Sequence, residues 1–96
     1  MGKYTVILTP EATEELIIWH KIGDKSTRRK IEKILLELSE HPTMGTGKAE
    51  RLRGDLSGYW SRRVNKKERI IYKIIDSVVT VQVFSLRGHY GDSLSE

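Results

Sequence analysis

Residues 58–74, GYWSRRVNKKERIIYKI, alternate apolar and polar side chains on both sides of a short polar turn, NKKE. This alternation predicts a β-hairpin with one side of each strand in a core. Six residues of the segment are cationic, which a hairpin does not need in order to fold: Arg62, Arg63, Lys66, Lys67, Arg69 and Lys73. Arg62 and Arg63 are neighbours on a strand and point to opposite faces, so only one of them can face a ligand.

The first half of the chain carries one short strand pattern and two helical patterns. Residues 4–8 are rich in β-branched side chains and predict a strand. Thr9 is placed to cap a helix that has Pro10 at its first position and ends near Gly23. A second helix is predicted over about residues 25–39, where apolar side chains recur on one face: Ile31, Ile34, Leu35 and Leu38.

The pattern of the second half predicts three further strands, over residues 59–64, 69–75 and 78–85. The sequence does not decide whether the preceding loop contains a short strand around residues 50–53. Ninety-six residues suffice for one domain, here residues 1–96. The order β-α-α-β-β-β predicts an α+β fold: a small antiparallel sheet with both helices on one face. The other face should be open and should carry the arginines. Residues 91–96 are expected to form a flexible tail.

The positive charge is concentrated in one half of the chain. Residues 1–47 carry seven basic and seven acidic side chains, whereas residues 48–90 carry ten basic and four acidic ones. One basic face is therefore expected, and nucleic acid is the commonest partner of such a face. A solvated sheet surface without a partner is the alternative, and charge alone leaves both open.

Several classes of function lack support in the sequence. No apolar run is long enough to span a bilayer and no secretory signal pattern is present, so a cytoplasmic protein without membrane contact is expected. The GTGK segment at residues 45–48 has the wrong spacing for a phosphate-binding loop and is followed by Ala49. The chain has no cysteine, and His20, His41 and His89 lack ligand spacing, so neither a metal nor a cofactor is expected.

A few polar residues could carry out chemistry on the open face. They are Lys48, Glu50, Arg63, Arg69, His89 and Tyr90. Metal-free cleavage of RNA needs a base for the 2′-hydroxyl, a cation for the charged phosphorane and an acid for the leaving oxygen. Glu, Arg and His can supply these roles in that order. Each residue taken singly also fits a surface ion pair or a solvated strand, so spacing alone leaves its role open.

Two segments resemble the RelE/ParE superfamily of toxins, and specifically its YoeB (Txe) branch. They are GKAERLRGDLSGYWSRRVNKKERIIYKI at residues 47–74 and RGHY at residues 87–90, and the resemblance extends over about residues 4–90. It implies a RelE-like fold. It also implies an endoribonuclease that cuts messenger RNA in the ribosomal A site, inhibits translation and is neutralised by a YefM-like antitoxin. Whether the chain forms a homodimer is left open.

The resemblance also implies a role for each candidate residue. Glu50 is the base and His89 the acid, with Tyr90 beside it in the catalytic set. Arg69 stabilises the transition state, and Arg63 contacts the phosphate. Lys48 and Arg53 are cationic positions at the loop edge that bind RNA phosphate. Because Arg63 is the matching arginine, Arg62 is expected to be dispensable for cleavage.

Two other functions fit the same fold. One is a ParE-like toxin that binds DNA gyrase without nuclease chemistry, and the other is a non-catalytic RNA-binding module. The set Glu50, Arg69 and His89 separates the nuclease from both, because a pure binder does not require it. An RNA-binding module would need an exposed aromatic on the sheet, for which Tyr59 is the candidate.

Overall fold

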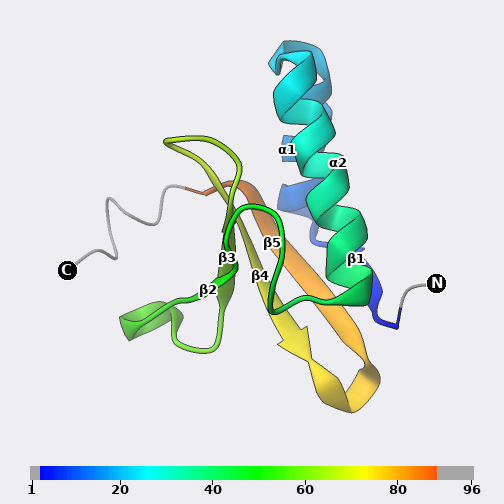
Figure 1. Ribbon diagram of the computed structural model, residues 1–96, viewed down its shortest axis with the longest axis vertical. Helices are drawn as coiled ribbons and strands as arrows, with labels where there is room; N and C mark the ends of the chain where they lie inside the picture. Colours follow the sequence, from blue (N-terminus) through cyan, green and yellow to red (C-terminus); the bar gives the residue numbers. More distant parts are fainter. Residues whose placement is uncertain (1–2, 89–96) are drawn as a thin grey trace.

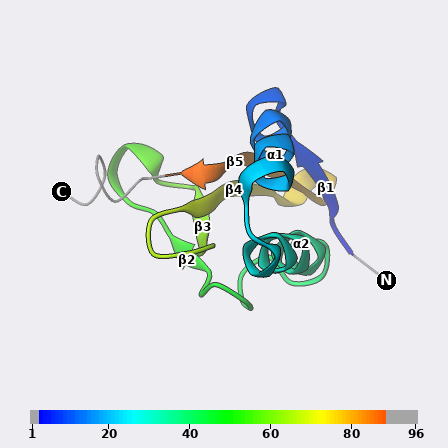
Figure 2. The same ribbon diagram turned by 90° about the horizontal axis from the view of Figure 1, so that it is seen from above.

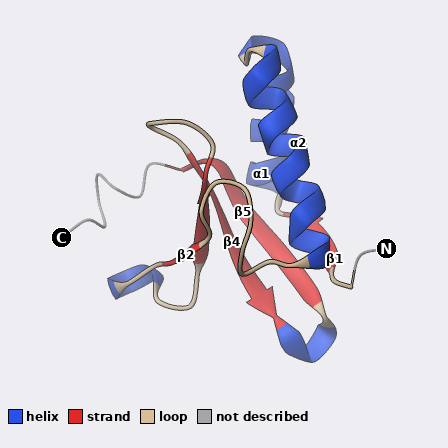
Figure 3. Cartoon of the chain, in the orientation of Figure 1, coloured by secondary structure: helices blue, strands red, loops and turns tan. Residues whose placement is uncertain are grey.

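The computed structural model describes residues 3–88, which form a sheet flanked by a helical hairpin (Figures 1 and 3). The elements follow in this order: β1 (Thr5–Leu8), α1 (Pro10–Ile22), α2 (Lys25–Glu40), β2 (Glu50–Arg51), β3 (Trp60–Arg63), β4 (Arg69–Ile75) and β5 (Thr80–Gly88). Two short 3-10 turns, Gly54–Leu56 and Asp76–Val78, precede β3 and β5. The predicted α+β class is confirmed.

The sheet is mixed rather than wholly antiparallel. Its strand order is β1-β5-β4-β3-β2, and β1 pairs with β5 in parallel whereas the other pairs are antiparallel. The expectation of an antiparallel sheet is therefore wrong for this one pair. Alternation of apolar residues fixes which face of a strand is buried, but it does not specify the neighbour of an isolated first strand.

The helix ends follow from local capping, as the sequence predicts. Thr9 Oγ1 accepts a hydrogen bond from the Ala12 N–H at 3.2 Å, and α1 ends where the Gly23 N–H bonds to the Trp19 carbonyl at 2.8 Å. The Asp24 carboxylate caps α2 by accepting from the Thr27 N–H at 2.7 Å. The two helices are thus joined by a very short turn and diverge from it (Figure 2).

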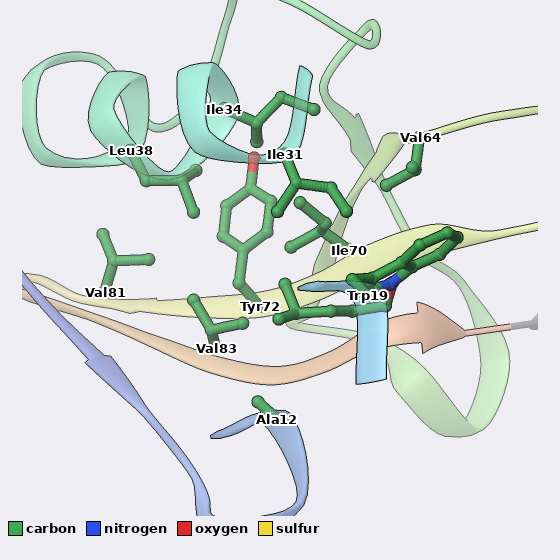
Figure 4. Close-up of a cluster of buried hydrophobic side chains, with 11 residues drawn as sticks. Ala12, Trp19, Ile31, Ile34, Leu38, Val64, Ile70, Tyr72, Val81 and Val83 are labelled. Atoms are coloured by element: carbon green, nitrogen blue, oxygen red, sulfur yellow. The ribbon is translucent and has the colours of Figure 1, made fainter. Parts of the chain in front are cut away.

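One hydrophobic cluster joins both helices to the same face of the sheet (Figure 4). Its buried members are Ala12, Trp19, Ile31, Ile34, Leu38, Val64, Ile70, Tyr72, Val81, Val83 and Leu86. Fully burying one such aliphatic side chain stabilises a fold by about 1.5–3 kcal/mol. The predicted stripe of α2 is confirmed, and the two helices leave the opposite face of the sheet uncovered by helix.

The side chain of Arg62 is fully buried and forms an ion pair with Glu37 of α2, with 2.8 Å between Nη1 and Oε1. Arg62 belongs to β3 and lies opposite Ile70, on the face that packs against the helices. It therefore does not face a ligand, in agreement with the opposite orientations expected for Arg62 and Arg63. The expectation that the open face carries the arginines is therefore wrong for Arg62.

Each of the five N–H donors of the buried guanidinium has an acceptor. The acceptors are Glu37 Oε1, the Thr46, His41 and Met44 carbonyl oxygens, and Tyr72 Oη. A guanidinium offers five donors in a fixed planar arrangement. Burial of this charge is tolerated because it is paired and fully hydrogen-bonded. Three of the acceptors are backbone oxygens of the loop 41–49, so Arg62 fixes the path of that loop (Figure 3).

Two glycines let the loop approach this ion pair and β3 closely. A Cβ atom on Gly45 would lie 2.4 Å from Glu37 Oε1, and the residue has a φ of +129°. A Cβ on Gly47 would lie 2.6 Å from the Arg63 carbonyl oxygen, at a φ of +82°. The Gly47 carbonyl accepts from the Arg63 N–H at 2.8 Å. These glycines therefore hold a defined path, where the sequence indicated only a freely turning loop.

We expect Arg62→Ala to destabilise the fold by about 3–5 kcal/mol, because it leaves the Glu37 carboxylate without its buried partner. The exposed neighbour gives a matched control, since Arg63→Ala should change stability by only about 0.5 kcal/mol. Chemical denaturation of both variants measures the difference. Equal stability of the two would contradict the structural role of Arg62. Loss of Arg62 should also loosen the loop that leads to Glu50. We therefore replace the expectation that Arg62 is dispensable for cleavage: Arg62→Ala should reduce activity through this loop.

A pH dependence follows from Glu37. Burial alone would raise the pKa of its carboxyl, but hydrogen bonds from Thr46 and from Arg62 outweigh burial and leave the pKa below its ordinary value of 4.5. The resulting stabilisation is present above that ordinary value and is lost as the pH falls through the lower folded pKa. Unfolding free energies measured against pH should therefore fall less steeply below about pH 4.5 for Glu37→Gln than for the parent chain. Glu32→Gln, an exposed change on the same helix, should follow the parent curve. Parallel curves for Glu37→Gln and the parent would contradict the assignment.

Candidate active site

The strand register places Glu50 on the face of the sheet that the helices leave uncovered. Glu50 of β2 lies opposite Ser61 of β3, and Ser61 lies opposite Ile71 of β4. Residues directly opposite each other share a face, and Ser61 and Ile71 alternate with the core residues Arg62 and Ile70. Glu50 is half-buried at the end of this row, on the outer strand of the sheet.

A second row on the same face carries two arginines. Arg63 lies opposite Arg69, and Arg69 lies opposite Gly88 of β5. Arg63 is two residues from Ser61 along β3, so its side chain is on the same face as Glu50. Arg63 is exposed and Arg69 is half-buried. The structure thus brings Glu50, Arg63 and Arg69 together on one face. Across the sheet they lie on three adjacent strands spaced about 4.8 Å apart, and along the strands the two rows are two residues apart.

This face is less open than the sequence predicts. Ser61 is fully buried and Ile71 is only 7% exposed, although both lie between the ionisable residues of the two rows. The expectation of an open face is therefore wrong at its centre. Short and apolar side chains in a sheet are shielded when longer side chains flank them on the same face.

The loop before β2 presents Lys48 in a strained conformation. Lys48 is exposed and has a φ of +55°, in the left-handed region that non-glycine residues seldom adopt. Such conformations persist only where the surrounding structure enforces them. The neighbouring Gly47 is hydrogen-bonded to β3, so the loop is held on both sides of this point: at Gly47 and at Glu50.

Arg53 lies apart from the two rows. It precedes the 3-10 turn Gly54–Leu56 and lines a shallow cavity of about 520 Å³ together with Arg51, Leu52, Ser57 and Gly58. Its guanidinium is exposed, three residues beyond Glu50. The structure therefore does not bring Arg53 together with Glu50, Arg63 and Arg69, and its predicted contact with RNA phosphate stays a prediction. Arg51 points to the other face, with its guanidinium 5.6 Å from the centre of the Trp60 ring.

His89 and Tyr90 lie outside the described residues, and so does the segment 91–96. Their predicted roles therefore remain predictions. The described part of β5 ends at Gly88, directly opposite Arg69. The strand prediction that ended at Ser85 is too short, because β5 continues to Gly88 through an irregular stretch.

That irregular stretch is held by Glu15 of α1, a residue that the sequence gave no reason to select. The register between β4 and β5 shifts on both sides of Ile71, so β5 carries extra residues there. A bulge leaves backbone N–H groups without acceptors on the neighbouring strand. Glu15 Oε1 supplies the acceptor for the Leu86 and Arg87 N–H groups at 2.7 and 3.1 Å, and for Ser85 Oγ at 3.1 Å.

Further contacts fix the end of β5 next to the candidate site. One helical turn beyond Glu15, Trp19 Nε1 donates to the Leu86 carbonyl at 2.8 Å. The Arg87 guanidinium lies 5.8 Å from the centre of the Trp19 ring and pairs with Glu68 at 3.4 Å. The strand that leads to His89 is thus anchored to α1 and to the β3–β4 turn.

Aromatic side chains occupy the far part of the same sheet face. The Tyr59 and Phe84 rings meet edge to face, with 5.2 Å between their centres, and Lys73 Nζ lies 5.5 Å from the centre of the Tyr59 ring. Tyr59 is half-buried by these contacts. Tyr72 is buried in the core and Trp60 packs against it.

Within residues 3–88 no three His, Cys, Asp or Glu side chains are grouped so that they could hold a metal ion. In the same part of the chain neither helix is long and apolar enough to cross a bilayer.

Comparison with known proteins points to one family. The family model of the YoeB-like toxins of bacterial type II toxin–antitoxin systems matches residues 8–90. Toxin YoeB of Mycobacterium bovis is 38% identical over 86 residues, which cover 90% of this chain and 98% of the relative. The solved structure of a YoeB/ParE toxin from Agrobacterium tumefaciens is 30% identical and superposes with a TM-score of 0.81, covering 90% and 99% of the two chains.

Two structures from Staphylococcus aureus extend the comparison to assemblies. The chain of a YoeB dimer superposes with a TM-score of 0.79, and that of a heterotetrameric YoeB–YefM toxin–antitoxin complex with a TM-score of 0.75. Each is 29% identical to this chain, and each match covers 93% of this chain and all of the other.

The anchoring of β5 by Glu15 gives a local prediction. Glu15→Ala should speed hydrogen exchange of the Leu86 and Arg87 amides about 10–100-fold, because hydrogen bonds to a charged acceptor contribute about 1.5–3 kcal/mol. Glu14→Ala, at the exposed neighbouring position, should leave both amides protected. Residue-resolved exchange by NMR measures both variants. Unchanged protection of Leu86 and Arg87 in Glu15→Ala would contradict the anchoring role.

Proposed function

Because this chain belongs to the YoeB-like toxins of bacterial type II toxin–antitoxin systems, we propose that it is an endoribonuclease that cuts messenger RNA in the ribosomal A site. The chain uses its own side chains for acid–base chemistry, without a metal ion. Translation stops because the message is cut while the ribosome is reading it.

The observation that carries this proposal is the register of the sheet. Glu50, Arg63 and Arg69 come from three different strands, yet the pairing places them on one face. A carboxylate and two guanidinium groups on one face supply a proton acceptor beside cations that can hold a phosphate. The described part of β5 ends at Gly88, opposite Arg69, and the acid that we propose is the next residue in the sequence, His89.

The reaction is an attack by the RNA on its own backbone. The Glu50 carboxylate takes the proton of the 2′-hydroxyl, and the resulting oxygen forms a bond to the adjacent phosphorus. Arg69 counters the negative charge that grows on the phosphorane oxygens, and Arg63 holds the phosphate. The bond from phosphorus to the 5′-oxygen breaks as His89 donates a proton to that oxygen. The products are a 2′,3′-cyclic phosphate and a 5′-hydroxyl.

The remaining residues of the site position the message. Tyr90 follows the acid and belongs with it in the catalytic set, in line with the family resemblance. Lys48 and Arg53 are exposed at the edge of the site and bind flanking phosphates. A chain of 96 residues has little surface on which to order a flexible RNA, so the ribosome supplies much of the orientation.

We extend the assemblies of the relatives to this chain. YoeB of Staphylococcus aureus forms a complex with YefM and is also known as a dimer. A YefM-like antitoxin with an acidic segment that folds on binding would match the basic face around Arg63 and Arg69. Such a segment would cover the candidate site and silence it. A homodimer is the second assembly that we propose.

The alternatives differ in what they demand of this face. A ParE-like gyrase binder has the same fold, so fold does not decide between the two. It has no need of a carboxylate aligned with two arginines. A non-catalytic RNA-binding module would use the Tyr59–Phe84 pair, which lies on the same face and could also hold a base of the message during cleavage.

We expect Glu50→Gln to reduce the cleavage rate about 10²–10⁴-fold, as is typical when a general base is lost. Arg69→Ala should reduce it about 10²–10³-fold, because a charge-stabilising group is removed. Both variants should still bind ribosomes. In vitro translation followed by mapping of message ends measures the rates, and Glu14→Gln on the exposed side of α1 is the charge-matched control. Cleavage by Glu50→Gln at the parental rate would contradict the assignment of the base, and no message cleavage by the parent chain would favour the gyrase-binding alternative.

A further inference from the structure

A second basic surface lies at the far end of the helical hairpin, where α1 turns into α2. Here a small cavity of about 190 Å³ is lined by His20, Lys25, Arg28, Arg29 and Glu32, a set that we call the hairpin pocket. Figure 1 shows this turn at the top of the molecule, well separated from β2 and β3. The hairpin pocket is therefore distinct from the candidate active site.

The hairpin pocket belongs to a dense run of positive charge. Residues 25–33 carry five basic side chains and one acidic one, and this surplus of four equals the net charge of the whole chain, +4. The run occupies the first half of α2, where the positive end of the helix dipole disfavours cations. Helix stability therefore does not account for it.

The cations of the hairpin pocket have few partners within residues 3–88. No carboxylate of that range forms an ion pair within 4.0 Å of Lys25, Arg28 or Arg29. Arg28 donates from Nη1 to the His20 carbonyl at 3.4 Å, but its buried Nε has no hydrogen-bond partner there. Nε is shielded from solvent, so an anion in the pocket would meet the terminal nitrogens of Arg28 and the exposed side chains of Lys25 and Arg29.

The lining indicates the kind of anion. Two guanidinium groups and one ammonium group match the oxygens of a phosphate, whereas the pocket offers no tryptophan, tyrosine or phenylalanine on which a base could stack. Glu32 would oppose free anions in general, but three cations outnumber it. A backbone phosphate of a large polyanion fits these features better than a nucleotide does.

We propose that the hairpin pocket binds a backbone phosphate of ribosomal RNA, at a segment separate from the message on the sheet face. This inference rests on the proposed function, because it needs the chain to work on the ribosome. The molecule measures 37 × 36 × 24 Å, so contacts at its two ends reach different RNA segments. Two separated contacts fix the orientation of the toxin, which a single basic face cannot do.

The test uses the full chain carrying Glu50→Gln, so that message stays intact during binding. Adding Lys25→Gln and Arg29→Gln removes two exposed cations of the hairpin pocket and leaves Arg28 in place. Binding to purified ribosomes should weaken roughly tenfold. The slope of log K against the logarithm of salt concentration should become less negative by about one to two, because fewer phosphate contacts release counterions. Lys30→Gln with Lys33→Gln is the matched control, since it removes the same charge from the same helix but outside the pocket lining.

Each outcome decides the matter. If the control pair weakens ribosome binding as much as the pocket variant does, the attraction comes from the overall charge of α2 and the proposal is overturned. Unchanged ribosome binding by the pocket variant would also overturn it. Normal ribosome binding together with weaker binding to a YefM-like antitoxin would assign the surface to a protein partner instead. A Glu50→Gln chain that binds no ribosomes at all would contradict the proposed function itself, and this inference with it.

Discussion

The buried guanidinium of Arg62 ties the sheet, a helix and the loop before β2 together. It lies between β3, α2, β4 and the loop 41–49, and an acceptor from one of these elements meets each of its five donors. A buried charge is costly unless every donor is satisfied, so any other path of the loop would leave donors unpaired. The chain is thereby committed to the one path that brings Gly47 to β3 and sets Glu50 opposite Ser61. A structural cation thus positions the carboxylate that we propose as the base.

Local patterns predicted most of the fold. The caps at Thr9 and Gly23, the buried stripe of α2 and the strand over residues 69–75 all appear in the structure, because each is decided by residues close in sequence. The partner of β1, the burial of Arg62 and the bulge held by Glu15 were not predictable in this way. Each depends on side chains or strands that are distant in sequence, and neither periodicity nor charge reports such contacts.

For the candidate site, the sequence predicted which residues share a face but not their surroundings. Alternation along β3 separated Arg62 from Arg63, and the structure places Arg63 with Glu50 and Arg69 on one face. What the sequence could not supply is how that face is presented. Lys48 takes up a left-handed conformation, and the centre of the face is closed over Ser61. Lys48 lies on the loop path that Arg62 enforces, whereas longer side chains on the same face shield Ser61. The loop that leads to Glu50 and the buried ion pair are therefore parts of one arrangement.

We propose that the 2′-hydroxyl of the message is the nucleophile on this face, so a single deoxy substitution at the cut site should prevent cleavage. A ribosome-bound message with one 2′-deoxynucleotide at the cut site should bind the toxin normally and remain intact, while the all-ribose message yields a 2′,3′-cyclic phosphate. Mapping the message ends and identifying the terminal phosphate distinguishes the outcomes. Continued cutting of the substituted message, or an immediate 3′-hydroxyl product, would require an activated water and would contradict the account.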